Sequence, residues 1–242
     1  MARGLTLQIR FMARRPTSIA FFARAIETVD NARTVISRNH ELKGNIMALT
    51  LKTPPAEGSD IIREALGELA GGPPTAFKAL AESVDASSNF NIAAPHPFYF
   101  VGLTDVAEGR LLAGAVLKGW RYLVLKDDET IGSANLIISG DQTLEFSHIS
   151  HGPFAQNTVE GISFAESLPE VISDDYELRL LDIPSLYVVL LWLHGSDDKL
   201  IPLPPTNSAL EPYKSYSEAE LSAALREPAL RRLESEGPLA TG

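Results

Sequence analysis

The chain has 242 residues, of which 45% are hydrophobic and 21% charged, a composition that is ordinary for a globular protein long enough to bury its own core. It has no cysteine, which excludes disulfides, thiolate nucleophiles and cysteine-based zinc or iron–sulfur centres. The formal net charge of −10 argues against nucleic acid as a partner, because phosphate binding needs a basic surface.

The first forty residues differ in charge from the rest. They hold seven arginines against Glu27 and Asp30, a local charge of +5, so residues 41–242 carry −15. Three targets are open for such a basic arm: its own body, a second copy of the chain, or an anionic membrane surface. We favour the second copy and expect homo-oligomerisation through residues of the arm and its helix: Arg10, Arg14, Arg15, Phe22 and Arg24.

Two elements are predicted within this arm, which we delimit as residues 1–40. Apolar and polar residues alternate from Leu5 to Phe11, which predicts a strand rather than the unbroken apolar run of a secretory signal. Apolar residues then recur at spacings of three and four between Pro16 and Asn39, which predicts an amphipathic helix. With no secretory signal and no apolar run of the ~20 residues that a membrane span needs, we expect a cytoplasmic protein without a transmembrane segment.

Residues 41–95 are expected to form short helices joined by loops. A strand is predicted over Ile46–Leu51, and helices over Asp60–Ala70 and Thr75–Val84, with proline- and glycine-rich stretches between them. A domain boundary, if there were one, would fall near residues 85–95. The part before it has too few strands and too little bulk for a core of its own, so we expect one domain overall.

Strands dominate residues 96–205. The turn residues that separate them predict a three-strand antiparallel meander, followed by a helix and three more strands. The order β-β-β-α-β-β-β predicts an α+β fold with a largely antiparallel sheet. The predicted elements are Phe98–Leu103, Trp120–Leu125, Ile131–Ile138, Leu144–Ser150, the helix Phe154–Leu168, Tyr176–Leu181, Leu186–Leu193 and Leu200–Leu203.

The most hydrophobic stretch lies near the end of this region. Residues 186–193 are apolar without a break, which is typical of a strand buried on both faces, and Pro202 favours an edge position for the short strand that follows. In the last segment, residues 206–242, a capping box at Ser217–Glu220 begins a helix that Pro228 is expected to interrupt, and the final residues are expected to be disordered.

The residues LWLHGSDDKLIPL, at 191–203, resemble the strand and turn that carry the acidic member of the catalytic triad in α/β-hydrolases. That family also requires a G-x-S-x-G nucleophile elbow upstream and a histidine after the acid. The nearest elbow, Gly161–Ala165, lacks its final glycine, and no histidine follows His194. A serine without a base is not activated, so we exclude this activity and interpret Gly195–Asp198 as a hairpin turn.

One group of residues has the chemistry of a metal site: Glu145, His148 and His151. In a regular strand Glu145 and His151 share one face and His148 points to the other, so the three converge only if the chain bends near His148. Aspartate pairs elsewhere lie in predicted turns, where they cap their own backbone. We therefore expect no cofactor and a non-catalytic interaction or self-assembly protein, with a metal-assisted enzyme using these three residues as the alternative.

Overall fold

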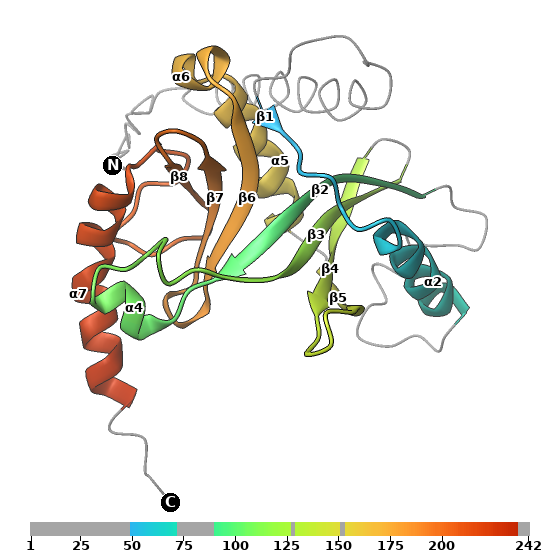
Figure 1. Cartoon of the computed structure of the whole chain (residues 1–242), viewed down its shortest axis with the longest axis horizontal. Coiled ribbons are helices and arrows are strands. Elements are labelled where there is room, and N and C mark those ends of the chain that lie inside the picture. The colour runs from blue at the N-terminus through green and yellow to red at the C-terminus, as the bar shows by residue number, and fades with distance from the viewer. Residues whose placement is uncertain (1–48, 72–89, 127–128, 151–152, 237–242) are drawn as a thin grey trace, which may run out of the picture.

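An eight-stranded sheet runs through the part of the chain that the computed structural model describes, residues 49–71, 90–126, 129–150 and 153–236 (Figure 1). The strand order is β5-β4-β3-β2-β6-β7-β8, and β1 pairs with β6 beside this path. The strands are β1 (Leu49–Thr50), β2 (Phe90–Phe100), β3 (Val116–Lys126), β4 (Glu129–Ile138), β5 (Leu144–Ser150), β6 (Tyr176–Ile183), β7 (Val188–His194) and β8 (Lys199–Leu203). Among the described strands, only two pairs are parallel, β1–β6 and β2–β6, so the predicted α+β fold with a largely antiparallel sheet is confirmed.

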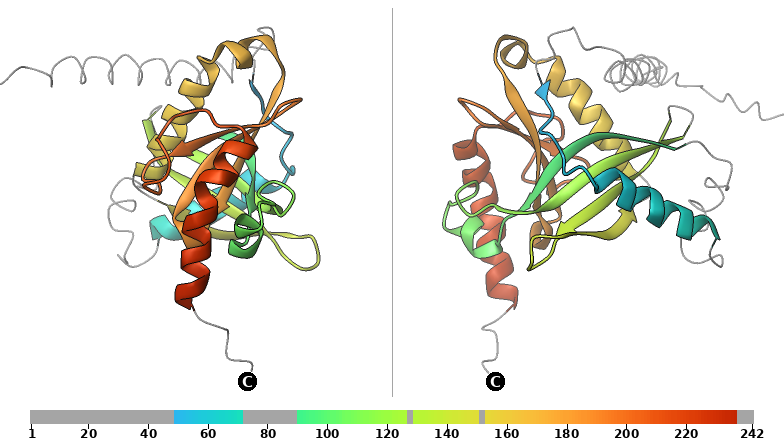
Figure 2. Two further views of the ribbon diagram at one scale, coloured as in Figure 1. Left: turned by 90° about the vertical axis from the view of Figure 1, so that its left-hand side faces the viewer. Right: turned by 45° about the vertical axis from the view of Figure 1, so that its right-hand side comes forward.

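Among the described residues, three helices are longer than one or two turns, and they cover the sheet on both faces (Figure 2). Helix α5 lies on one face, where Val159 meets the β3 residues Leu123 and Leu125, and Ile162 meets β7 and β8. The opposite face is covered by α2 over β3–β5 and by α4 with α7 over β6–β8. The helices are α2 (Gly58–Gly71), α4 (Leu103–Ala107), α5 (Pro153–Glu166), α6 (Pro169–Ser173) and α7 (Glu218–Glu236).

The meander β3–β4–β5 and the helix after it follow the predicted order. Strand β2 differs: it begins at Phe90, inside a stretch whose composition is polar, and it ends at Phe100, so Leu103 starts α4 instead of ending a strand. The reason is its position. Strand β2 pairs with β3 over its whole length and with β6 near its end, and these two ladders outweigh local composition.

Prolines occupy two different positions in the helices of the described chain. Pro169 lies in the first turn of the short helix α6, where its missing N–H costs nothing. Pro228 was expected to end the C-terminal helix, and this is wrong: α7 continues through it to Glu236. Apolar residues on both sides of Pro228, Leu225 and Ala229, are fully buried against the sheet and α4, and this packing holds the helix together.

The hydrophobic stretch near the C-terminus forms the antiparallel strands β6, β7 and β8, as predicted. A 3-10 turn, η1 (Pro184–Leu186), and Tyr187 with a φ of 53° join β6 to β7. Strand β8 is the last in the sheet order, but its Leu200 exchanges backbone hydrogen bonds with Tyr216, so a loop covers part of this edge.

Several predicted elements lie outside the described residues: the strand over Leu5–Phe11, the helix over Pro16–Asn39, the helix over Thr75–Val84 and the tail after residue 236. Within the described part of the chain, no helix combines the length and the hydrophobicity needed to cross a membrane.

Candidate functional site

Four polar residues lie side by side across four neighbouring strands on one face of the sheet. His96 of β2 is opposite Arg121 of β3, Arg121 is opposite Asn135 of β4, and Asn135 is opposite His148 of β5. Directly opposite residues of antiparallel strands project on the same side, so the four side chains form a continuous row. We call these four residues the polar row.

The polar row faces the side of the sheet that carries α5. The residues that alternate with it, Trp120, Tyr122, Ala134 and Leu136, are buried in the core under α2 on the opposite side. Their burial fixes the register, because a slip of one residue would turn Arg121 into that core. The structure places Arg121 on a half-buried face rather than in open solvent.

A β-bulge in β5 changes the expected geometry of the histidine segment. The register between β4 and β5 shifts between the pairs Asn135–His148 and Leu136–Phe146, which leaves Ser147 as the extra residue. Glu145 is opposite Ile137, two residues from Asn135, so Glu145 and His148 lie on the same face. The expectation that His148 points away from Glu145 is therefore wrong, because it assumed an unbroken period of two.

Hydrogen bonds connect the polar row in one direction. Arg121 has only donors, so its Nε donates to Asn135 Oδ1 at 2.8 Å. The amide Nδ2 of Asn135 then donates to His148 Nε2 at 3.2 Å, and His148 Nδ1, the protonated nitrogen of this tautomer, donates to Ser147 Oγ at 3.0 Å. Burial, followed by the nearby Arg121 charge, lowers the pKa of His148, which is consistent with a neutral imidazole.

His96, at the other end of the polar row, is fully buried at 0% exposure. Its Nδ1 donates to the carbonyl of Ala94 at 2.7 Å, so Nε2 carries the lone pair, and this atom has no hydrogen-bond partner among the described residues. Burial is the main cause that lowers the pKa of His96 to about 4, against an opposing contribution from Ala94. At neutral pH Arg121 therefore lies between two uncharged imidazoles.

The charge of Arg121 is not matched by an ion pair in the described part of the chain. Burial of its guanidinium lowers its pKa, and the carboxylate that opposes this effect is Asp182 of β6. Burial in turn raises the pKa of Asp182, and Arg121 counteracts it, yet no ion pair within 4.0 Å joins the two groups. The guanidinium carbon instead lies 5.9 Å from the ring centre of Phe98. The polar row thus holds a partly desolvated cation whose protein partners are neutral.

The structure describes only two of the three residues of the predicted metal site. Glu145 and His148 share a face, while His151 lies outside the described residues. No group of three or more metal-ligating side chains occurs within residues 49–71, 90–126, 129–150 and 153–236. The lone pair of His148 Nε2 already accepts from the Asn135 amide, so a metal ion at that nitrogen would have to displace the amide.

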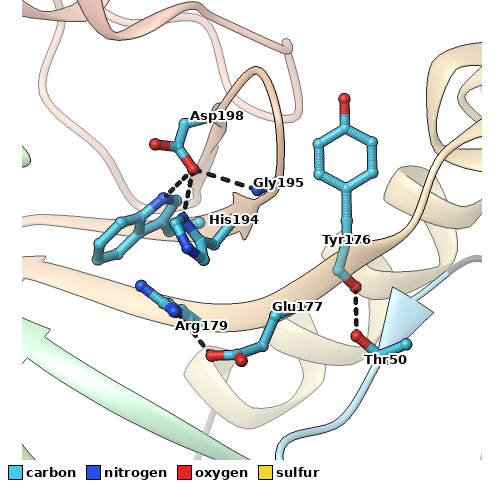
Figure 3. A network of polar contacts seen from close by, with 8 residues as sticks. Thr50, Tyr176, Glu177, Arg179, His194, Gly195 and Asp198 are labelled. Carbon is cyan, nitrogen blue, oxygen red and sulfur yellow. Dashed lines mark hydrogen bonds and ion pairs between the residues drawn. The ribbon is translucent and has the colours of Figure 1, made fainter.

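A second polar cluster lies at the β7–β8 turn, on the other side of the sheet, and Figure 3 shows Asp198 at its centre. One carboxylate oxygen of Asp198 accepts from Trp192 Nε1 at 3.0 Å, from His194 Nδ1 at 2.8 Å and from the Gly195 N–H at 3.3 Å. The predicted hairpin turn at Gly195–Asp198 is confirmed, and Asp198 caps it. His194 is oriented by this carboxylate, with its Nε2 directed away from it.

Arg179 in the same cluster offers a contrast to Arg121 (Figure 3). Its Nε donates to Glu177 Oε1 at 2.7 Å, and its guanidinium carbon lies 4.7 Å from the ring centre of Trp192 and 5.5 Å from that of Tyr99. This arginine has a carboxylate partner and aromatic faces, as a structural arginine requires. Among the described residues, Arg121 has no carboxylate partner of the kind that Glu177 provides for Arg179.

The other sequence-predicted residues are readily placed. Ser163 lies inside α5 rather than on a strand-to-helix turn, in agreement with the exclusion of a hydrolase elbow. Asp197 pairs with Lys199, and Asp174 and Asp175 are exposed before β6. The arm residues Arg10, Arg14, Arg15, Phe22 and Arg24 all lie outside the described residues.

Sequence reasoning did not single out Arg121, His96, Asn135 or Asp182 as a group. Each is a polar side chain at a core-facing position of its strand, and this is the signal that the sequence contains. These four side chains meet because their strands are neighbours in the sheet, and the sequence does not show which strands are neighbours.

Comparison with protein-family models, with curated proteins and with solved structures gives no match.

Proposed function

We propose that this protein is a non-catalytic binding protein, and that the polar row binds a small acidic molecule through Arg121. The observation that carries the proposal is a desolvated guanidinium with one hydrogen bond to a neutral amide and no ion pair among the described residues. Removing a cation from water costs several kcal/mol unless an anion compensates it. An acidic ligand supplies that compensation, and the two neutral histidines beside Arg121 leave its charge unopposed by other cations.

The fork of N–H groups on a guanidinium matches a carboxylate or a phosphate. The Arg121 Nε–H is held by Asn135, which leaves the outer N–H groups to meet a ligand. Ser147 and His148 close the hydrogen-bonded chain on the far side, so Asn135 is fixed and keeps the guanidinium oriented. Orientation before binding reduces the entropy that the complex loses.

The test is titration of the full-length protein with 4-methylpentanoate and with inorganic phosphate, followed by calorimetry and by the ¹⁵N resonance of Arg121 Nε. We expect saturable binding of at least one anion at one site, its loss in Arg121→Met, and its retention in the control Arg179→Met. Equal binding by the parent and Arg121→Met, or no binding of either anion by the parent, would contradict the proposal.

We also retain the proposal of homo-oligomerisation through the basic arm, which is supported by the charge difference between residues 1–40 and the rest of the chain. Its test is the native mass of the protein at low and high salt. Assembly that weakens with salt and disappears when Arg10, Arg14 and Arg15 are changed to glutamate supports the arm as the interface. Unchanged assembly of that variant removes the arm from consideration.

A metal-assisted enzyme is the second candidate, and the bulge at Ser147 favours it by placing Glu145 and His148 on one face. The amide of Asn135 on His148 Nε2 counts against it. Equilibrium dialysis against zinc and manganese tests this candidate. Stoichiometric binding that is lost in His148→Ala supports a metal site, and no retained metal rejects it.

A further inference from the structure

Asp182 lies on the same face as Arg121, at the end of a short apolar floor. Arg121 is above Phe98, with 5.9 Å between its guanidinium carbon and the ring centre. The rings of Phe98 and Phe100 are 5.7 Å apart, and Phe100 is the Cα partner of Asp182 across the β2–β6 ladder. The two aromatic rings thus connect a cation at one end to a carboxylate at the other.

The face of each residue follows from the packing. Leu178 and Leu180 of β6 belong to the core under α5, and Asp182 continues this alternation on the same side. Phe98 belongs to the same core, and Phe100 packs against it while remaining partly exposed. Phe98 itself is buried, with 2% of its surface exposed, whereas Arg121 and Asp182 are partly exposed like Phe100, so solvent reaches this face at Phe100 and at the two charges.

The two charges are left apart, although a buried pair gains most by direct contact. No ion pair within 4.0 Å joins them, and the Asp182 carboxylate has no hydrogen-bond partner among the described residues. The other residues of the polar row do not bind the Asp182 carboxylate either, because Asn135 and His148 bond to each other and His96 is fully buried. Two opposite charges that face one apolar surface without touching match a molecule that carries both charges itself.

We infer that the ligand of the polar row is a small zwitterion, with its carboxylate on Arg121, its ammonium group on Asp182 and its apolar part against the exposed part of Phe100. An α-amino acid with an apolar side chain has this chemistry. This inference rests on the proposed binding function and adds the second half of the recognition: Asp182 selects for a cationic group beside the acid. The aromatic floor accepts the apolar part of the ligand.

The experiment compares leucine with its two halves, 4-methylpentanoate, which lacks the amino group, and 3-methylbutylamine, which lacks the carboxylate. Calorimetry on the full-length protein is expected to give leucine an affinity at least about tenfold higher than either half, because a charge-assisted hydrogen bond is added at each end. Asp182→Asn is expected to lower leucine affinity to that of 4-methylpentanoate while leaving 4-methylpentanoate binding unchanged.

The matched control is Asp174→Asn, which removes an exposed carboxylate just before β6, the strand that carries Asp182, and is expected to leave all three affinities unchanged. Urea unfolding of Asp182→Asn verifies that the variant is folded. If leucine and 4-methylpentanoate bind equally, or Asp182→Asn binds leucine like the parent, the zwitterion inference is overturned while the acidic-ligand proposal stands. If no carboxylate binds and Arg121→Met changes nothing, both fail.

Discussion

Replacing Arg121 with methionine separates a binding residue from a structural one. Methionine keeps most of the length of the side chain and removes the charge. In a protein that holds Arg121 for its ligand, the ligand-free state gains from this change, because a desolvated cation disappears and an apolar side chain takes its place above Phe98. In a protein that needs Arg121 for its fold, the same change is damaging.

The magnitude follows from the contacts. The substitution removes one hydrogen bond from a charged donor to Asn135, worth about 1.5–3 kcal/mol, and a contact with Phe98 worth about 0.5–1 kcal/mol. It also removes the desolvation penalty of a partly exposed cation, at most several kcal/mol, because Arg121 forms no ion pair within 4.0 Å among the described residues. We therefore expect the free energy of unfolding of Arg121→Met to lie within about 1 kcal/mol of the parent, or above it.

Arg179→Met is the matched control. Arg179 and Glu177 form a pair at 2.7 Å whose side chains are only 14% and 26% exposed, and Arg179 also lies over two aromatic rings. Losing it leaves Glu177 unpaired, and we expect a loss of about 2 kcal/mol. The assay is urea unfolding of both variants in a buffer without carboxylate or phosphate. A loss of more than about 2 kcal/mol in Arg121→Met would refute the reasoning and make Arg121 a structural residue.

Three further changes test the fold. The pKa of His96 is about 4 in the folded protein and ordinarily 6.5, so on acidification the imidazole is protonated first in the unfolded chain. The free energy of unfolding therefore falls by on the order of 3 kcal/mol as the pH decreases from 6.5 to 4. His96→Phe should flatten this pH dependence in urea unfolding, and an unchanged slope would contradict His96 as its cause. A Cβ on Gly119 would lie 1.8 Å from a backbone oxygen, so Gly119→Ala should lower the free energy of unfolding by about 3 kcal/mol or more. A Cβ on Gly67 would have nothing within 4 Å, so Gly67→Ala should raise the free energy of unfolding by up to about 1 kcal/mol. Thermal unfolding measures both, and equal effects would reject this packing. Asp198→Ala removes the acceptor of three donors and should lower the free energy of unfolding in urea by about 2–3 kcal/mol. Asp197→Ala should lower it by less than about 1 kcal/mol. The reverse order would contradict the assignment of Asp198 as the cap of the turn.

Among the described residues, the sequence by itself determined the elements that depend on neighbours along the chain. Turn residues at 140–141 and 195–198 predicted two hairpins, and alternation over Tyr176–Leu181 predicted a strand, because a period of two and a tight turn are local properties. The capping box at Ser217 predicted the start of α7 correctly, since Glu220 accepts from Ser217 within one turn.

Only the tertiary structure decided the extent of β2, the passage of α7 through Pro228 and the phase of β5. Each depends on partners that are distant in sequence: two ladders for β2, buried apolar neighbours for α7, and the core under α2 for β5, which holds Leu144, Phe146 and Ile149 on one side across the bulge.

The candidate site depends on tertiary structure most of all. Arg121 and Asp182 are far apart along the chain, and they share a face because β2 is inserted between β3 and β6. The sequence shows which strand residues are polar, but the pairing of strands decides which of these residues meet. Pairing is a property of the whole sheet, set by the burial of both faces, and no local pattern specifies it.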